Sequence, residues 1–324
     1  MNSPLKVGIV GTGYAAQRRA EAIQEDERSQ LLYFAGNRPE SIKTFSQTYS
    51  IPVLNSWQEL ATHPELDLVI IANINRDHAQ IAKTALQAGK HVIVEYPLAF
   101  TAYEGQELIN IAKQQNKLLH VEHIELLGGL HNTIRQYLSE IGEVFFARYN
   151  TTAIQHIASR RWTYHKELFG FPFIAALSRI HRLTNLFGEV ASVSCQSRFW
   201  DAPEEGYFTS CLSDAQIKFT SGIIAQATYG KGEVFRYSDR TFELHGTQGS
   251  LIFWGEEGKL MRDQEEIPLL SGTRRGLFKK DTQLVLDYLF EQQPLYVNVE
   301  DSLYALKVAQ AAEQSSITIK TVLL

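Results

Sequence analysis

The chain carries glycines near its N-terminus at a spacing that suits the phosphates of a dinucleotide. Gly11-Thr12-Gly13-Tyr14-Ala15-Ala16 has the form G-x-G-x-x-A and directly follows an apolar run, Lys6–Val10. The first glycine permits a tight turn, the second lets the backbone approach a pyrophosphate, and the small third residue lets the next helix pack closely on the strand. Between a strand and a helix this turn predicts a dinucleotide site, although a structural turn without a ligand has the same pattern. The predicted contacts are Gly11, Thr12, Gly13, Tyr14 and Ala15.

The end of the next predicted strand indicates which dinucleotide is bound. Ala35 leads into Gly36-Asn37-Arg38-Pro39, with no acidic residue before Glu40. An acidic residue at this place usually binds the ribose 2′-hydroxyl of NAD and would repel a 2′-phosphate, whereas Arg38 would attract one. We therefore predict NADPH as the cofactor, with NADH bound more weakly and with Asn37 and Arg38 as contacts. The alternative is that Arg38 is a surface residue of a loop and binds no phosphate.

The tripeptide Glu95-Tyr96-Pro97 follows another short apolar run, His91–Val94. Tyr96 offers a hydroxyl that can serve as a proton source. A phenol with a pKa near ~10 cannot supply the positive charge that lowers the pKa of a sugar alcohol. Oxidation of a sugar is therefore not expected.

A cluster of ionisable residues, H-x-E-H-x-E, runs from His120 to Glu125. If the strand before it continues, alternation places Glu122 on one face with His120, and His123 on the other face with Glu125. These side chains would contact the cofactor or the substrate, or else be satisfied polar groups at a domain junction. No metal site is expected, because the two histidines lack further ligands at a convincing spacing.

Two arginines, Arg179 and Arg182, lie three residues apart on a predicted helix and therefore share a face. They can hold an anionic group or stabilise negative charge that develops during a reaction. As proton donors they are poor, because the pKa of arginine exceeds ~12. The alternative is a solvated helix face. A second basic run, Arg274–Lys280, can also bind anions, but we favour a solvated loop before a helix capped by Asp281.

In the first 120 or so residues the predicted strands alternate with helices, which is typical of a doubly wound parallel sheet. The near-continuous apolar run Leu66–Ala72 fits a strand covered on both faces. The other predicted strands are Lys6–Val10, Leu31–Ala35, His91–Val94 and Lys117–Val121. The predicted helices are Gln17–Gln24, Asp77–Ala88 with Gly89 at its end, and Ala102–Gln115.

After residue 125 or so, strand-like segments follow one another and predict one large, mostly antiparallel sheet with helices on one face. The predicted strands are Val144–Asn150, Val190–Arg198, Ala215–Phe219, Gly222–Tyr229, Arg240–His245 and Gly249–Trp254. Helices are expected at Phe173–Phe187 and Asp281–Phe290. The fold class is thus α/β plus α+β, with a dinucleotide-binding Rossmann domain at 1–124 and a substrate domain at 125–324.

Composition excludes several classes of protein. The 324 residues carry a formal net charge of −5, which gives no reason to expect nucleic acid or an anionic membrane as a partner. No run of about 18 apolar residues exists to span a bilayer. Cys195 and Cys211 are the only cysteines, which suggests a reducing compartment without a disulfide framework. A predicted strand begins almost at once after Met1, so we expect no signal peptide and a cytoplasmic protein.

Four motifs resemble the family of glucose–fructose oxidoreductases and inositol dehydrogenases. They are Val7–Gly13, Asn73–His78, Ala88–Val92, and Glu95-x-Pro97-Leu98-Ala99. That family has lysine where this chain has Tyr96, and its usual catalytic aspartate and histidine would fall near Ile174 and Ser178.

Glu95-Tyr96-Pro97 together with His120–Leu127 is similar to one branch of this family, the biliverdin reductases. Segments of the second half, such as Arg161–His165, Ala176–Ile180 and Arg274–Phe278, resemble the cyanobacterial members. The resemblance implies NADPH-dependent hydride transfer to the central methine carbon of biliverdin, a linear tetrapyrrole, giving bilirubin. This chemistry deprotonates no alcohol and needs no lysine base.

The resemblance also implies roles for individual residues. Implied catalytic residues are Arg179, Tyr96, Glu125 and His123. Implied substrate contacts are Arg179, Arg182, Glu122 and His123. Further implied cofactor contacts are Ala72, Asn73, Ile74, His78, Glu95, Tyr96 and Trp162. The proton donor stays open between Tyr96, a group held by Arg179, and the substrate's own protonated nitrogen.

Two other functions remain open from the sequence. One is a sugar or polyol dehydrogenase of the parent family, which would need a base that the motifs do not supply. The other is a non-catalytic NADP-binding regulator. A substrate laid on the sheet favours a monomer over the homodimer that parent-family members often form through this sheet.

Overall fold

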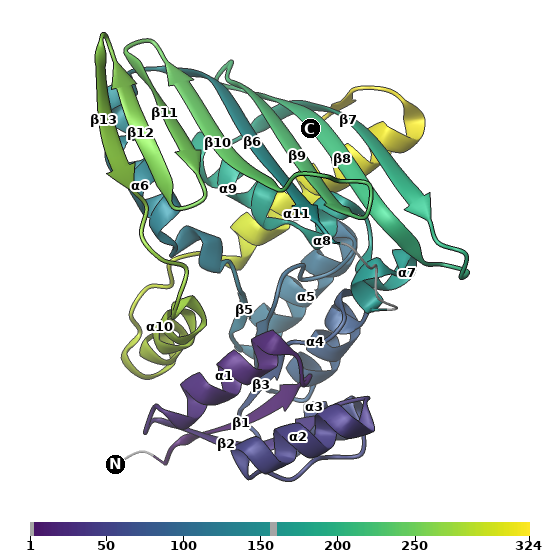
Figure 1. Ribbon diagram of the computed structural model, residues 1–324. Coiled ribbons are helices and arrows are strands. Elements are labelled where there is room, and N and C mark those ends of the chain that lie inside the picture. The colour runs from purple at the N-terminus through teal and green to yellow at the C-terminus, as the bar shows by residue number, and fades with distance from the viewer. Residues whose placement is uncertain (1–2, 156–160) are drawn as a thin grey trace. The chain divides into compact units, whose positions relative to one another are not determined.

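A five-stranded parallel sheet is built almost entirely from the first part of the chain. In the computed structural model, which describes residues 3–155 and 161–324, its strand order is β2-β1-β3-β4-β5 (Figure 1). All neighbouring strands are parallel. The strands are β1 (Leu5–Val10), β2 (Ser29–Ala35), β3 (Leu68–Ile71), β4 (His91–Val94) and β5 (Leu119–Val121). The predicted Rossmann sheet is confirmed.

Helices on both faces bury the apolar runs of this sheet. Every residue of β3 is fully buried, as expected for a strand covered on both sides. The helical elements are α1 (Tyr14–Gln24), α2 (Pro39–Tyr49), α3 (Trp57–Thr62), η1 (Asn75–Asp77), α4 (His78–Gln87) and α5 (Ala102–Gln115). Thr101 and Glu104 form a capping box at the start of α5, which explains why this helix begins where the sequence predicted.

The chain divides into two compact units, and the first is not continuous in sequence. It comprises the residues up to Ile124 together with Gly276–Leu303. The returning segment brings α10 (Leu277–Glu291) beside α1, as Figure 1 shows. Here one prediction is wrong: Asp281 does not cap a helix, because α10 already begins at Leu277 and Asp281 lies fully buried inside it.

The second unit, Glu125–Arg275 with Tyr304–Leu324, contains a nine-stranded sheet. Its order is β13-β12-β11-β10-β6-β9-β8-β7-β14, and β6 and β9 are parallel while the other pairs are antiparallel. The strands are β6 (Val144–Ile154), β7 (Val190–Asp201), β8 (Phe208–Phe219), β9 (Ile224–Gly232), β10 (Asp239–Gly246), β11 (Gly249–Trp254), β12 (Glu257–Arg262), β13 (Glu265–Leu270) and β14 (Val322–Leu323). The large, mostly antiparallel sheet is confirmed.

Helices pack on one face of this sheet (Figure 1). They are η2 (Ile124–Leu126), α6 (Gly129–Tyr137), η3 (Leu138–Ile141), η4 (Trp162–Tyr164), α7 (Lys166–Phe169), α8 (Pro172–Ala175), α9 (Ser178–Phe187) and α11 (Val299–Thr318), the last beginning in the first unit. The single helix predicted over Phe173–Phe187 is two, because the chain leaves helical geometry between α8 and α9. The 20-residue helix α11 was not predicted.

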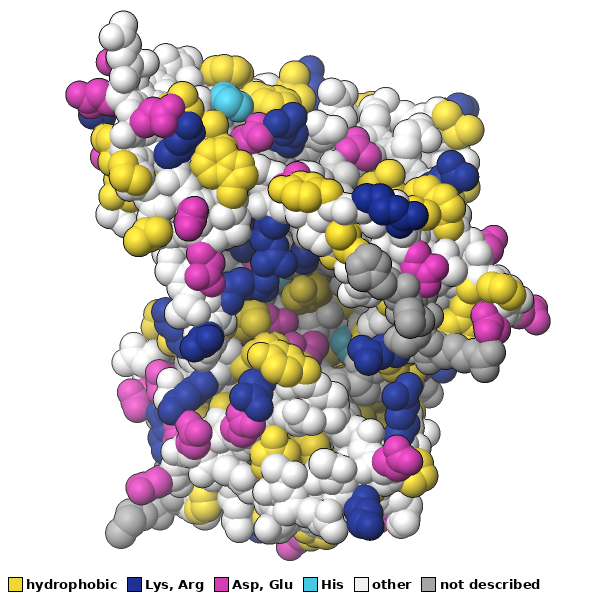
Figure 2. Space-filling model, in the orientation of Figure 1, with side chains coloured by type: hydrophobic (Ala, Val, Ile, Leu, Met, Phe, Trp, Pro, Cys, Tyr) yellow, Lys and Arg dark blue, Asp and Glu magenta, His cyan; other side chains and the backbone are white. Residues whose placement is uncertain are grey.

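The distribution of charged side chains on the surface is consistent with the net charge of −5. Acidic and basic side chains are interspersed in both units over the face drawn in Figure 2. No helix among the described residues is long and apolar enough to cross a membrane.

Candidate functional site

The glycine turn lies at the point where the order of the parallel strands reverses direction, between β1 and β3. Gly11 has φ +125°, and a Cβ placed on it would lie 2.2 Å from the carbonyl oxygen of Ala72. Only glycine therefore fits there. In open α/β sheets this switch point, at the carboxyl ends of the strands, is where ligands bind.

The surroundings of this turn fit a dinucleotide. A Cβ on Gly13 would meet nothing within 4 Å, so the backbone before α1 faces open space. The first turn of α1 contains no acidic residue, and its N-terminus therefore keeps its attraction for phosphate. Tyr14 is 70% exposed, while the buried Oδ1 of Asn73 has no hydrogen-bond partner among the described residues. The unpartnered oxygen of Asn73 and the exposure of Tyr14 fit the predicted cofactor contacts.

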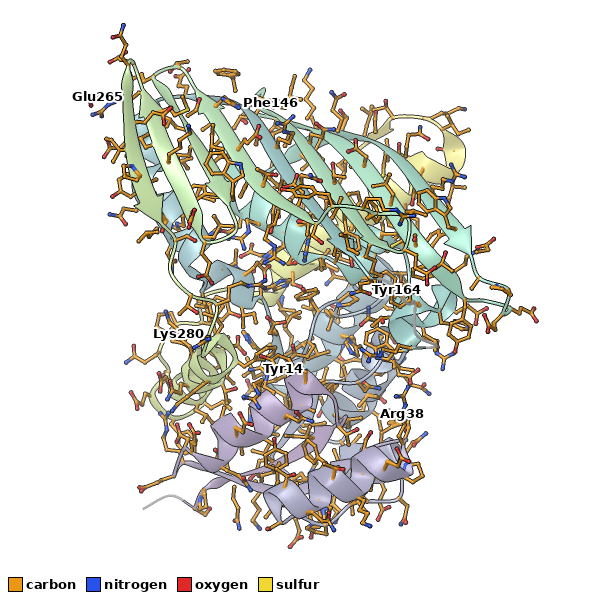
Figure 3. The ribbon with its side chains drawn as sticks, in the orientation of Figure 1. Tyr14, Arg38, Phe146, Tyr164, Glu265 and Lys280 are labelled. Carbon is orange, nitrogen blue, oxygen red and sulfur yellow. The ribbon has the colours of Figure 1, made fainter. Side chains whose placement is uncertain are left out.

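Arg38 is the residue predicted to bind a 2′-phosphate. It is exposed and serves as the N-cap residue of α2, at the end of β2 (Figure 3). Gly36 lies against the glycine turn, because a Cβ on it would be 2.8 Å from Cγ2 of Thr12. The segment from Gly36 to Arg38 is thereby held beside the turn, with the guanidinium open to solvent.

The Glu95-Tyr96-Pro97 motif follows β4 and is fixed from several sides. Glu95 accepts a hydrogen bond from Nε of Arg19 at 3.0 Å, and the Tyr96 ring stacks on His123 at 5.7 Å between centroids. The carbonyl of Pro97 lies 2.8 Å from Nδ1 of His78. Burial lowers the pKa of His78, and the predicted contact of this side chain with the cofactor stays a prediction.

A buried ionic network that the sequence did not reveal lies behind this motif. Arg19, fully buried, forms an ion pair with Asp281 as well as with Glu95. Asp281 also accepts hydrogen bonds from His120 at 2.9 Å and from the hydroxyl of Tyr296 at 2.5 Å. Because α10 comes from far along the chain, no local pattern could have indicated these partners.

The alternation expected for H-x-E-H-x-E is wrong, because β5 ends at Val121 and the chain turns into η2. His123 instead places Nε2 2.8 Å from the hydroxyl of Ser302. Glu122 accepts a hydrogen bond from the backbone of Ile124 at 2.6 Å. In the second unit, Glu125 lies 3.1 Å from Nδ1 of His181. Each of these side chains thus has a structural partner, and their catalytic roles stay predictions.

Arg179 and Arg182 share a face of α9, as predicted, but this face is not solvated. Arg182 is only 5% exposed, and its guanidinium lies 5.7 Å from the ring centroid of Tyr149. Its Nε and Nη1 have no hydrogen-bond partner among the described residues. Arg179 lies 5.2 Å over the ring of Tyr229 and donates a hydrogen bond to Ser178. A buried cation with unmet donors indicates a place for an anionic ligand.

Trp162 belongs to η4, in a segment that a buried lysine holds against the sheet. Lys231 donates to the carbonyl of Thr163 at 2.6 Å, and its ammonium lies 3.7 Å from the ring centroid of Phe169. Burial lowers the pKa of Lys231 to about 8. No local pattern in the sequence indicated the role of Lys231. The predicted contact of Trp162 with a cofactor stays a prediction.

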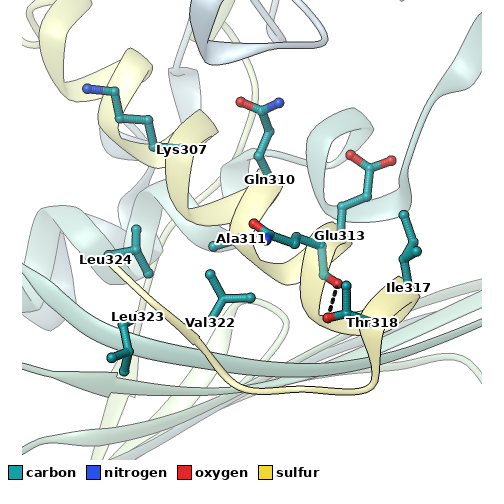
Figure 4. A pocket seen from close by; sticks show the side chains of 10 residues that line it. Lys307, Gln310, Ala311, Glu313, Ile317, Thr318, Val322, Leu323 and Leu324 are labelled. Atoms are coloured by element: carbon teal, nitrogen blue, oxygen red, sulfur yellow. Dashed lines mark hydrogen bonds between the residues drawn. The ribbon is translucent and has the colours of Figure 1, made fainter.

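The basic run Arg274–Lys280 is not one loop. Its second half is already helical, and Lys279 forms a surface ion pair with Glu25 at 2.7 Å. A surface pocket of about 500 Å³ lies elsewhere, between the end of α11 and the last residues of the chain (Figure 4). Ile317 and Val322 are among its lining residues, and none of the predicted site residues lines it.

Comparison with known proteins identifies two family models in this chain. An oxidoreductase family with an NAD-binding Rossmann fold matches residues 5–123, and its C-terminal alpha/beta domain matches residues 136–324. The crystal structure of a Synechocystis biliverdin reductase in complex with biliverdin and NADP⁺ is 55% identical, covers 96% of this chain and 99% of that one, and has a TM-score of 0.95.

Curated relatives are more distant. Mouse biliverdin reductase A is 28% identical over 298 residues, which are 91% of this chain and 88% of the mouse protein. A dTDP-3,4-didehydro-2,6-dideoxy-alpha-D-glucose 3-reductase of Saccharopolyspora spinosa is 26% identical over 259 residues, covering 78% of this chain and 75% of that protein. At this level of identity both tetrapyrrole and sugar enzymes are similar to the chain.

Proposed function

Because the chain belongs to the oxidoreductase family whose models match residues 5–123 and 136–324, we propose that it reduces biliverdin to bilirubin with NADPH. The observation that carries this proposal is the 55% identity, over 96% of the chain, to a reductase solved with biliverdin and NADP⁺. The motif with Tyr96 agrees, since a phenol cannot replace the lysine that a sugar dehydrogenase needs.

In this proposal the first unit holds the cofactor and the second unit supplies cations for the substrate. The domain bounds 1–124 and 125–324 are part of the proposal, and the first unit includes Gly276–Leu303 in addition to the first of these ranges. When bound, NADPH supplies hydride to the central methine carbon. The glycine turn receives its pyrophosphate, Arg38 its 2′-phosphate, and Ala72, Asn73 and Ile74 line the same edge. Tyr96, Glu95 and Trp162 are further proposed cofactor contacts.

The substrate's anionic groups require the second unit. Biliverdin carries two propionates, and Arg182 offers buried donors without partners among the described residues. Arg179 stabilises negative charge on the tetrapyrrole as hydride arrives. Glu122, His123 and Glu125 complete the proposed contacts. A monomer in the cytoplasm is the proposed state of the protein.

The decisive experiment mixes the purified protein with biliverdin and NADPH and follows the visible spectrum. Loss of the biliverdin band with growth of a bilirubin band is the expected result. An unchanged spectrum at both acidic and neutral pH would overturn the proposal. Binding of NADPH without oxidation would then favour a regulator, which binds the cofactor but does not consume it.

Reversal of charge at Arg38 tests the cofactor assignment. Arg38→Glu should weaken NADPH and favour NADH, because a carboxylate repels the 2′-phosphate and accepts from a free 2′-hydroxyl. We expect the ratio of kcat/KM for NADPH over NADH to fall by about tenfold or more, as for the loss of one charge-assisted contact. Arg76→Glu, at an exposed arginine paired with Asp77, is the matched control. An unchanged ratio in Arg38→Glu would remove Arg38 from the site.

A further inference from the structure

A single phenol in the second unit is surrounded by cationic side chains. Tyr149 lies on β6, opposite Phe242 of β10, and the two rings stack at 4.6 Å with an interplanar angle of 21°. The guanidinium of Arg182 lies 5.7 Å from the centroid of the Tyr149 ring. Arg179 and Arg240 are close enough to act on the phenol electrostatically. The Tyr149 ring is thus stacked on Phe242 and lies close to the positive charge of Arg182.

Several polar groups near Tyr149 are buried without a hydrogen-bond partner among the described residues. Tyr149 itself is 5% exposed, and no hydrogen bond of its hydroxyl is found among the described residues. Thr151, two residues further on the same strand and hence on the same face, is 5% exposed, and its Oγ1 has no partner there either. Nε and Nη1 of Arg182 are two further buried atoms without a hydrogen-bond partner among the described residues. Buried groups of this kind normally have partners, so this cluster is shaped for a polar ligand.

The positive charges of the neighbouring arginines change the pKa of Tyr149. Burial alone would raise the pKa of Tyr149, but the positive charges of Arg182, Arg179 and Arg240 together lower it below 10, against a smaller opposing effect of Glu125. The pKa of Arg240 is lowered in turn, by its own burial and by the neighbouring arginines. The cluster has an excess of positive charge and favours an anion, including a phenolate.

We propose that Tyr149 is a further catalytic residue, whose hydroxyl donates the proton that biliverdin reduction requires. This proposal rests on the proposed function. In the step, the O–H bond of Tyr149 breaks and an N–H bond forms at a pyrrole nitrogen next to the reduced methine carbon. The two electrons come with the hydride, NADPH leaves as NADP⁺, and the phenolate regains its proton from solvent.

The arginines can bind an anion but cannot donate a proton, and in this proposal Tyr149 performs the second task. Arginine stays charged because its pKa exceeds ~12, so it holds anions but gives up no proton. A phenol beside it has a proton to give, and the resulting phenolate is stabilised by the same guanidinium. Efficient general acids have a pKa near the working pH, and the arginines move Tyr149 in that direction.

The first test replaces Tyr149 with phenylalanine, which keeps the stacking on Phe242 and removes only the hydroxyl. We expect kcat for biliverdin to fall by about 10²-fold or more, within the range for loss of a general acid, while KM for NADPH is unchanged. Tyr49→Phe is the matched control, because burial and Glu21 raise the pKa of this phenol, which is also only 7% exposed. The control should retain wild-type turnover, and a kcat for Tyr149→Phe within threefold of wild type would overturn the proposal.

The second test measures the ionisation of the Tyr149 hydroxyl in the absence of turnover. NMR titration of protein with labelled tyrosine rings should show that the ring whose signal vanishes in Tyr149→Phe has a pKa below the ordinary value for tyrosine. Arg240→Gln removes one of the positive charges that lower the pKa of Tyr149, so the pKa of this phenol must rise. A general acid works only while protonated, so the falling alkaline limb of the kcat profile must move to higher pH with it.

These outcomes separate the two proposals. A wild-type protein that leaves biliverdin unchanged overturns the proposed function. An active wild type in which the pKa of Tyr149 is not lowered, or an Arg240→Gln variant whose phenol pKa shifts while the pH profile does not, overturns only the role of Tyr149. The titration of the wild type and of Arg240→Gln also keeps the proposal testable if Tyr149→Phe does not fold.

Discussion

Arg179→Ala is expected to lower kcat for biliverdin reduction by about 10²- to 10³-fold, the usual effect of removing one group that stabilises charge in a transition state. Arg179 lies on α9 with its guanidinium 5.2 Å from the centroid of the Tyr229 ring, so its position is fixed before substrate binds. Hydride arrival adds negative charge to the tetrapyrrole, and this charge needs a positioned cation. The measurement is steady-state kinetics at saturating NADPH.

Two further variants sharpen this test. Arg179→Lys keeps the charge but loses the planar fork, so its kcat should lie between those of wild type and Arg179→Ala. Arg262→Ala removes an arginine whose surface ion pair with Glu140 has no part in the proposed chemistry, and its kcat should equal that of wild type. Near-normal turnover in both Arg179→Ala and Tyr96→Phe would contradict the proposed catalytic roles of these two residues.

Asp281→Ala should destabilise the protein by about 3 to 5 kcal/mol, the usual cost of breaking a buried ion pair by removing one partner. Arg19 and Asp281 are both fully buried, and the substitution also deprives His120 and Tyr296 of their shared acceptor. Urea unfolding of the holoprotein measures the change. Asp287→Ala is the matched control on the same helix, because its pair with Arg28 is partly exposed and should contribute less than about 1 kcal/mol.

The same pair predicts how stability depends on pH. Burial alone would raise the pKa of Asp281, but Arg19 and His120 hold it well below the ordinary value of 3.8. A carboxyl whose pKa is lowered by folding stabilises the protein above its ordinary pKa, and this contribution disappears as pH falls further. The free energy of unfolding should therefore fall less steeply below pH 3.8 in Asp281→Asn than in wild type. Identical acid profiles would show that Asp281 is not ionised in the folded state.

Features with a local cause were predictable from the sequence. The glycine turn needs its glycines whatever the rest of the chain does, because Gly11 has a positive φ and a Cβ there would collide with Ala72. The strand His91–Val94 and the helix Ala102–Gln115 have the predicted bounds, since an apolar run and a capping box define them. Arg179 and Arg182 share a helix face because their spacing alone requires it.

Other features have no local cause. The long helix α11 escaped prediction because its buried residues, such as Ala305, Leu306 and Val308, are spread around the helix instead of forming one apolar stripe. The H-x-E-H-x-E run looked like a continuing strand, yet its side chains find partners on distant elements, as His123 does with Ser302. The backbone conformation of this run therefore depends on tertiary contacts and not on its local pattern.

The sequence by itself thus determined the glycine turn, the class of both sheets and the family, since these depend on turn sterics, hydrophobic periodicity and motifs read in one stretch of chain. Only the tertiary structure decided which charges are buried together. Asp281 meets Arg19 across 262 positions, and Tyr149 gathers arginines from α9 and β10. The physical reason is that electrostatic and packing energies depend on distance in space, which periodicity along the chain does not specify.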